Sequence, residues 1–150
     1  MVRRAAPLLL LAASSLFGGC RDPAPAPARS PARPAVISFR RDLAPTLDLH
    51  CGACHGARKN REVEIDLRPA AAWASLVDRP AEKRDGWRLV KPGDSRASFL
   101  VDKLAGNVGP GEGKAMPLDA ITKRPMVPSP VAQWLETKLL PWIDSGAPNN

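Results

Sequence analysis

The chain has 150 residues, enough for one domain of ordinary size but not for two domains together with a membrane bundle. Its 44% hydrophobic and 25% charged residues indicate a globular protein rather than a disordered one. Aromatic residues make up only 5%, so we expect something other than large rings to fill part of the core. The formal charge of +7 is spread along the chain without a basic run interleaved with aromatics, which argues against nucleic acid as a partner.

Residues 1–19 have the pattern of a targeting segment. Two arginines precede a mainly apolar run at 5–17, whose length suits a signal peptide and is short for a membrane-spanning helix. The run ends in Leu16-Phe17-Gly18-Gly19-Cys20, which resembles a bacterial lipobox, although Phe17 stands where Leu is usual. The resemblance implies cleavage before Cys20, its lipidation, and a lipoprotein at the periplasmic face of a bacterial membrane. The alternative is an ordinary cleaved signal in which Cys20 has no role.

Residues 20–35 are expected to form a tether between the lipidated Cys20 and the globular part. Of the 15 residues from 21 to 35, ten are Ala or Pro, which cannot provide an apolar face to bury. In the polyproline form this segment reaches on the order of 45 Å. The globular domain is then expected at residues 36–150.

The chemistry of the chain is concentrated in His50-Cys51-Gly52-Ala53-Cys54-His55, which contains Cys-x-x-Cys-His, the pattern for covalent haem attachment. The thiols of Cys51 and Cys54 would add across the two vinyl groups of haem, while the small residues between them let the ring edge lie against the backbone. His55 follows directly, so its imidazole can bind the iron. Because the third cysteine would take a lipid, every cysteine of the chain then has a role.

A redox dithiol and a zinc site are the two other interpretations of this motif. A redox dithiol does not need His55 and usually lies in a βαβ setting, which the sequence lacks. Zinc takes four ligands, and only two Cys and two His, crowded into six residues, are available. We therefore expect one covalent haem c in each chain.

From residue 38 to residue 148 the chain resembles small monohaem cytochromes c of the bacterial periplasm. Besides the haem motif, the resemblance rests on four weaker motifs in the family's order: Asp42-Leu43-Ala44-Pro45-Thr46-Leu47, Pro92-Gly93-Asp94-Ser95-Arg96-Ala97-Ser98, Met116-Pro117 and Trp142-Ile143-Asp144-Ser145-Gly146-Ala147. The resemblance implies a small all-α, cytochrome c-like bundle wrapped around the haem.

The residue pattern by itself also predicts helices. We expect Asp42 to cap a short helix that holds Pro45 in its first turn, and Pro69 to open a second helix. Asp94 should cap a third helix, which ends at Gly106. The segment 63–67 alternates like a strand but has no obvious partner, so we expect an extended loop there.

The last helix should begin at Ser129 and Pro130 and stop at Gly146. Its apolar face is expected to carry Val131, Trp134, Leu135, Leu139, Trp142 and Ile143. Pro141 lies inside this helix and should kink or split it, because it has no amide hydrogen to donate. The resemblance to the cytochrome family implies that Trp142 packs in this helix against the first one, as aromatic residues of the family do.

The second axial ligand of the iron follows by elimination. His50 adjoins the first motif cysteine and cannot easily reach the opposite haem face, and the chain has no other histidine. The soft ligands that remain are Met116 and Met126. Met116 follows a glycine-rich loop and precedes Pro117, like the family's Met-Pro, so we expect it to bind the iron with Met126 as the alternative. Either methionine would otherwise be an ordinary core residue.

These features together predict an exported, lipid-tethered electron carrier rather than an enzyme, with no small-molecule substrate and with a redox partner protein that the sequence does not identify. His/Met ligation would fill both axial positions and favour a raised reduction potential. Two alternatives remain open. One is a haem-based sensor or peroxidase-like enzyme whose methionine leaves the iron, and the other is a structural lipoprotein with a non-essential haem.

Overall fold

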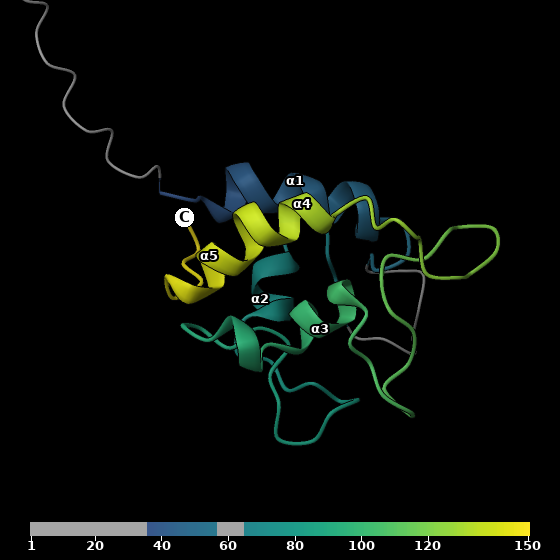
Figure 1. Ribbon diagram of the computed structural model, residues 1–150. Coiled ribbons are helices and arrows are strands. Elements are labelled where there is room, and N and C mark those ends of the chain that lie inside the picture. Colours follow the sequence, from purple (N-terminus) through teal and green to yellow (C-terminus); the bar gives the residue numbers. More distant parts are fainter. Residues whose placement is uncertain (1–35, 57–64) are drawn as a thin grey trace, which may run out of the picture. The chain divides into compact units, whose positions relative to one another are not determined.

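The computed structural model describes residues 36–56 and 65–150, so the signal segment, the tether and Cys20 lie outside the described residues. Within the described ranges every regular element is helical and no strand forms, apart from isolated bridges such as Val77 with Val90 (Figure 1). The all-α prediction is therefore confirmed for this part of the chain. None of its helices is long and apolar enough to cross a membrane.

The first helical stretch runs without a break through η1 (Phe39–Leu43), α1 (Ala44–Leu47) and η2 (Asp48–Gly52). Its π-helical first turn lets the amide of Ala44 donate to the carbonyl of Phe39, directly before Pro45. A wide turn at this point accommodates a residue that has no amide hydrogen and whose ring crowds the preceding turn. Pro45 therefore lies inside a longer helical stretch than the sequence predicted.

Ser38, not Asp42, is the N-cap of this stretch, so that prediction was wrong. The Ser38 hydroxyl accepts a hydrogen bond from the Arg41 amide, and the Ser38 amide donates to the Asp42 carboxylate at 2.8 Å. Both side chains thus satisfy amides that the helix leaves free at its start. Asp42 does so from one turn inside the helix.

The central elements are α2 (Ala72–Leu76), the 3₁₀ turn η3 (Ser95–Ala97) and α3 (Phe99–Ala105). Pro69 precedes α2 by three residues rather than opening it. Asp94 is a cap as predicted, because its carboxylate accepts from the Ala97 amide at 3.1 Å, but it caps the 3₁₀ turn. Gly106 ends α3 in the left-handed conformation, with a φ of 87°, which also confirms the prediction.

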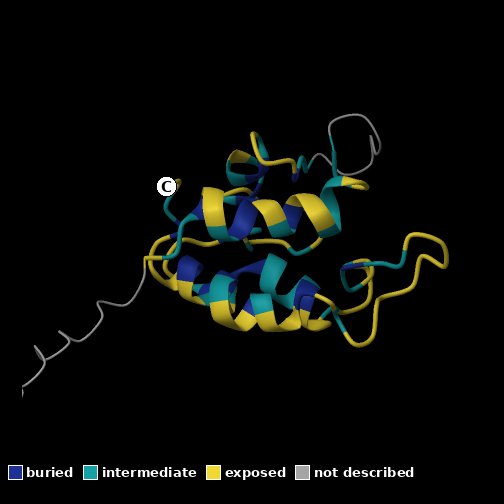
Figure 2. Ribbon diagram, turned by 90° about the horizontal axis from the view of Figure 1, so that it is seen from above, coloured by how far each residue is buried: buried dark blue, intermediate teal, exposed yellow. Residues whose placement is uncertain are grey.

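The last helical stretch consists of α4 (Ala132–Trp134), η4 (Leu135–Leu139) and α5 (Leu140–Asp144). Pro141 neither breaks nor splits it, because a π-helical turn precedes the proline, as one also precedes Pro45. All of the residues predicted for its apolar face are buried except Trp134, which is half-buried. Figure 2 shows this alternation of buried and exposed positions along the helices.

The first and last helical stretches lie side by side (Figure 1). The fully buried Trp142 packs on Phe39 with 5.3 Å between ring centroids, which confirms the predicted contact. The indole nitrogen of Trp134 donates to the carbonyl of Asp42 at 3.1 Å. Around these contacts the core gathers Leu43, Leu47, Leu76, Val90, Leu104, Leu135, Leu139 and Ile143.

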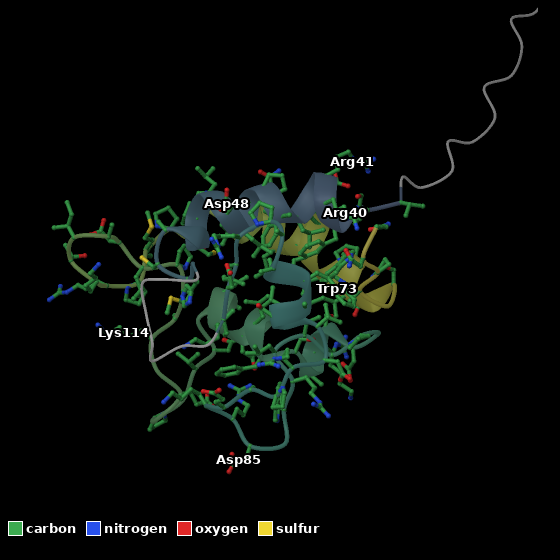
Figure 3. The ribbon with its side chains drawn as sticks, turned by 180° about the vertical axis from the view of Figure 1, so that it is seen from behind. Arg40, Arg41, Asp48, Trp73, Asp85 and Lys114 are labelled. Carbon is green, nitrogen blue, oxygen red and sulfur yellow. The ribbon has the colours of Figure 1, made fainter. Side chains whose placement is uncertain are left out.

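Two long connections between helices lie wholly within the described residues. The first, from 77 to 94, extends away from the core as far as Asp85, and the second, from 106 to 131, includes the glycine-rich loop that carries Lys114 (Figure 3). The described part of the predicted extended segment, residues 65–67, belongs to neither helix nor strand, in agreement with the prediction. These connections, together with α2 and α3, supply most of the walls of the cavity described next.

Candidate functional site

The Cys-x-x-Cys-His motif lies where the first helical stretch ends. Cys51 is in η2, and its carbonyl accepts hydrogen bonds from the amides of both Cys54 and His55, at 3.0 and 2.8 Å. A Cβ atom at Gly52 would lie 2.6 Å from a carboxylate oxygen of Asp48, whose exposed side chain can move aside. The end of the helix thus folds the motif back on itself.

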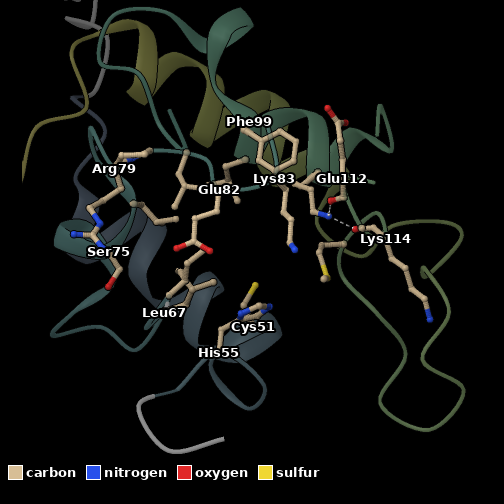
Figure 4. Close-up of a pocket in the computed structure, with 18 residues that line it drawn as sticks. Cys51, His55, Leu67, Ser75, Arg79, Glu82, Lys83, Phe99, Glu112 and Lys114 are labelled. Carbon is tan, nitrogen blue, oxygen red and sulfur yellow. Dashed lines mark hydrogen bonds between the residues drawn. The ribbon is translucent and has the colours of Figure 1, made fainter. Parts of the chain in front are cut away.

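A cavity of about 250 Å³ opens next to the motif, and Cys51, His55 and Met116 all line it (Figure 4). The first two residues come from the end of the first helical stretch, whereas Met116 comes from the loop after α3. The apolar wall of the cavity consists of Ile65, Leu67, Leu76, Leu89, Phe99 and Leu100. A mainly apolar concavity with a few polar groups converging on it is typical of a ligand or cofactor site.

The other predicted site residues lie elsewhere. Cys54 is exposed and does not line the cavity, so only one of the two motif thiols faces it. His50 is half-buried and does not line the cavity either. Met126 is 39% exposed and contributes nothing to the wall. Both cysteines are free thiols.

The backbone carbonyl of His55 makes a hydrogen bond, whereas its ring nitrogen Nδ1 makes none. Its carbonyl accepts a 2.7 Å hydrogen bond from the Leu67 amide, which joins the motif to the apolar wall. The ring nitrogen Nδ1 is buried without a hydrogen-bond partner, an arrangement that is costly unless another group completes the site. Burial, and secondarily the positive charge of Lys103, lower the pKa of His55. The ring is therefore favoured in its neutral form, which binds metals.

The thiol of Cys51 is largely shielded from solvent and does not ionise readily. Burial raises its pKa to about 11, with a smaller contribution from Cys54. At neutral pH it is therefore a thiol rather than a thiolate, unlike the activated cysteines of dithiol oxidoreductases.

The loop that carries Met116 is fastened to α3. The Met116 amide donates to the Lys103 carbonyl at 2.7 Å, and the Lys103 ammonium donates to the carbonyls of Glu112 and Lys114 (Figure 4). Lys103 and Glu112 also line the cavity and were not predicted from the sequence. The only sequence signal for Lys103 is its place in the periodic pattern of α3, where a lysine ordinarily indicates a solvated face.

The donor set of the cavity suits haem, because haem iron requires only two protein ligands and the cavity offers one His and one Met. For the thioether positions the match is partial, since Cys54 is exposed and does not line the cavity. Across residues 36–56 and 65–150, the motif included, no group of three or more His, Cys, Asp or Glu could hold a metal ion. Comparisons of the chain with family models, with curated proteins and with solved structures found no match.

Proposed function

We propose that this protein is an exported c-type cytochrome that carries single electrons. One observation carries the proposal: Cys51 and His55, from the end of the first helical stretch, line the same mainly apolar cavity as Met116, from the distant loop after α3. Each belongs to the set of residues that the motifs single out for haem. If these residues only filled the core, the histidine would have no role there, and its ring nitrogen, buried without a hydrogen-bond partner, would only be a cost.

The residues of the cavity have distinct roles in this proposal. When bound, haem supplies an iron centre that takes up and releases one electron. Cys51 and Cys54 would hold the ring through thioethers, and Cys54 would have to turn toward the cavity to do so. His55 and Met116 would supply the nitrogen and sulfur ligands, and thioether sulfur favours ferrous iron and so raises the reduction potential.

The walls of the cavity explain why we propose a carrier rather than an enzyme. Phe99, Leu100 and Leu67 form part of the apolar wall of the cavity, and apolar surroundings tune the reduction potential of a metal site. If His55 and Met116 both bound the iron, the protein would supply every ligand that the haem leaves open, and no position would remain for a substrate. The residues of the cavity would then support electron transfer without binding or converting a small molecule.

The finer fold assignment and the location are parts of the same proposal. A cytochrome c-like bundle is supported by the packing of Phe39 on Trp142 and by the position of the motif at the end of the first helical stretch. The lipobox-like segment supports attachment of Cys20 to a bacterial membrane, with the domain on the periplasmic side. Its redox partner would be another protein.

The test is covalent haem. Expressed with a cytochrome c maturation system, the wild-type protein should give a band on a denaturing gel that stains for haem and survives solvent extraction. The double variant Cys51→Ala, Cys54→Ala should lose the stain, whereas Cys20→Ser, which changes the third cysteine, should keep it. A wild-type protein that binds no haem, or binds zinc instead, would refute the proposal.

A further inference from the structure

Arg84 is a mostly buried cation in the long connection before α3. Its side chain is only 17% exposed, and its guanidinium lies 4.4 Å from the ring centroid of Trp87 and 4.6 Å from that of Phe99. Phe99 is itself part of the cavity wall. A guanidinium placed over two aromatic rings is fixed in position and partly desolvated, so its hydrogen bonds are strongly directional.

Those hydrogen bonds go to the glycine-rich loop and to α3. Arg84 binds the Glu112 carboxylate with two parallel bonds, Nε to Oε1 at 2.6 Å and Nη2 to Oε2 at 2.7 Å. Its Nη1 donates to Asp102 of α3, and its Nη2 also donates to the carbonyl of Asn107 at 3.2 Å. The Arg84 guanidinium thus connects α3 to Asn107 and Glu112, which lie at the two ends of the turn after this helix.

Glu112 is in turn bonded to the backbone of the loop and to Lys103 of α3. Its carboxylate accepts a 2.8 Å bond from the Gly109 amide, and its carbonyl accepts the Lys103 ammonium at 3.0 Å. The loop needs such restraints, because Gly111 and Gly113 adopt φ values of 85° and 81° and glycines lose much freedom when they are ordered. Four residues after Glu112, the same loop presents Met116 to the cavity.

We propose that Arg84 and Glu112 are positioning residues for Met116: their bidentate ion pair holds loop 106–116 against α3 and thereby keeps the thioether at the cavity. This inference rests on the proposed function, because Met116 is a ligand only when haem is bound. It goes beyond that function in naming what decides how readily Met116 leaves the iron. Without the pair, the loop retains the Lys103 contacts, the bonds from the Gly106 and Asn107 amides to the Asp102 carbonyl and the bond from the Lys114 ammonium to the Lys123 carbonyl, but it loses the side-chain bridge to Arg84 and gains freedom.

The test uses the purified haem-loaded protein and reads the Met–iron bond directly. In the oxidised state the weak sulfur-to-iron charge-transfer band reports the fraction of bound Met116, and in the reduced state the rate of carbon monoxide binding reports how often it leaves. Arg84→Gln and Glu112→Gln should each weaken the band and speed carbon monoxide binding by about tenfold or more, as expected for loss of a charge-assisted bidentate pair. Arg84→Lys keeps the positive charge but cannot form two parallel hydrogen bonds, so its band intensity and its rate of carbon monoxide binding should be intermediate.

Arg88→Gln is the matched control, because it removes the same charge from the same connection. The Arg88 side chain pairs with the Asp78 carboxylate at 3.5 Å and donates to the Asp78 carbonyl at 3.0 Å, and it bonds to neither Glu112 nor α3. The one bond from Arg88 to α3 is made by its backbone carbonyl, which accepts from the Phe99 amide and which the substitution keeps, so the band and the rate should stay at wild-type values. If Arg84→Gln fails to fold, Glu112→Gln, which changes only the loop, decides the matter.

Full band intensity and an unchanged rate in folded Arg84→Gln or Glu112→Gln would overturn the positioning role while leaving the proposed function intact. A wild-type protein that carries haem but lacks the band would instead refute Met116 ligation, and the positioning role with it.

Discussion

The amide of Met116 donates a 2.7 Å hydrogen bond to the carbonyl of Lys103, so the candidate ligand is tied directly to α3. The same helix contributes Phe99 and Leu100 to the wall of the cavity. One helix therefore both shapes the apolar wall and supports the loop that presents the sulfur. Met126 has no such connection, since its amide bonds to the carbonyl of Pro117 and its side chain is 39% exposed.

Replacing Met116 with Ala should leave haem covalently attached and open one axial position. We expect the oxidised protein to lose the sulfur-to-iron band and its reduction potential to fall, because thioether sulfur favours ferrous iron. Met126→Ala is the matched control and should retain both the band and the potential. Absorption spectra and a redox titration of the two variants measure these properties. Loss of the band in Met126→Ala alone would reverse the ligand assignment, and its survival in both variants would exclude Met ligation.

Carbon monoxide distinguishes a carrier from a sensor or a peroxidase-like enzyme. With His55 and Met116 both bound, the reduced wild-type protein should take up carbon monoxide slowly and incompletely at neutral pH. Met116→Ala should take it up rapidly, which shows that the assay detects an open position. Rapid, stoichiometric uptake by the untreated wild-type protein would contradict the carrier account and favour the sensor.

The contact between Trp142 and Phe39 should dominate the stability of the fold. Trp142→Ala removes a fully buried ring and the hydrogen bond from its indole nitrogen to the Pro148 carbonyl, at 3.0 Å. We expect a loss of roughly 3–5 kcal/mol in the free energy of unfolding. Ile121→Ala, at a side chain that is 89% exposed, should change it by less than about 0.5 kcal/mol. Urea unfolding followed by circular dichroism measures both, and equal effects would show that this contact is not central.

Asp42 makes the first helical stretch sensitive to acid. Hydrogen bonds from the Arg41 side chain and from the Ser38 amide lower its pKa to about 2, from an ordinary value of 3.8. Because the pKa is lower in the folded state, the stabilisation is complete above the ordinary value and is lost as the pH falls through about 2. Asp42→Asn should therefore be less stable than wild type at pH 7, and the difference should close between about pH 4 and pH 2. A difference that stays constant over this range would contradict the role of the ionised carboxylate.

The lipid anchor remains a prediction from the sequence. The intact mass of the mature protein should correspond to a chain that starts at Cys20, plus haem, plus a diacylglyceryl group, commonly with a further acyl chain. Cys20→Ser should abolish the lipid mass without affecting the haem. An unmodified Cys20, or a mature N-terminus at another residue, would show that the segment is an ordinary cleaved signal.

Local signals predicted the parts of the fold that depend on neighbours in the chain. Asp94 caps the 3₁₀ turn that directly follows it, and Gly106 ends α3. Both were predictable because capping and left-handed conformations depend on a few adjacent residues. The buried face of the last helix likewise follows from its own periodicity. The choice of Ser38 over Asp42 as the N-cap could not be predicted in this way, because both side chains favour helix starts and both take part.

The candidate site was predictable only where a motif marks it. Cys51, His55 and Met116 stand out by residue type and spacing, and the structure places all three at one cavity. Arg84 and Glu112 do not stand out, because a charged residue in a loop ordinarily faces solvent, and their pairing depends on contacts between segments that are distant in the sequence. The exposed position of Cys54 was equally unpredictable, since its orientation depends on how the chain turns after η2.

The central claim is that the chain carries one electron at a time on a covalent haem, and a spectroelectrochemical titration of the purified protein tests it most directly. The account predicts a single reversible transition that follows a one-electron Nernst curve, with one haem per chain and six-coordinate spectra at both ends. A chain without a redox-active chromophore, or a two-electron transition assigned to Cys51 and Cys54 as a thiol–disulfide couple, would contradict it.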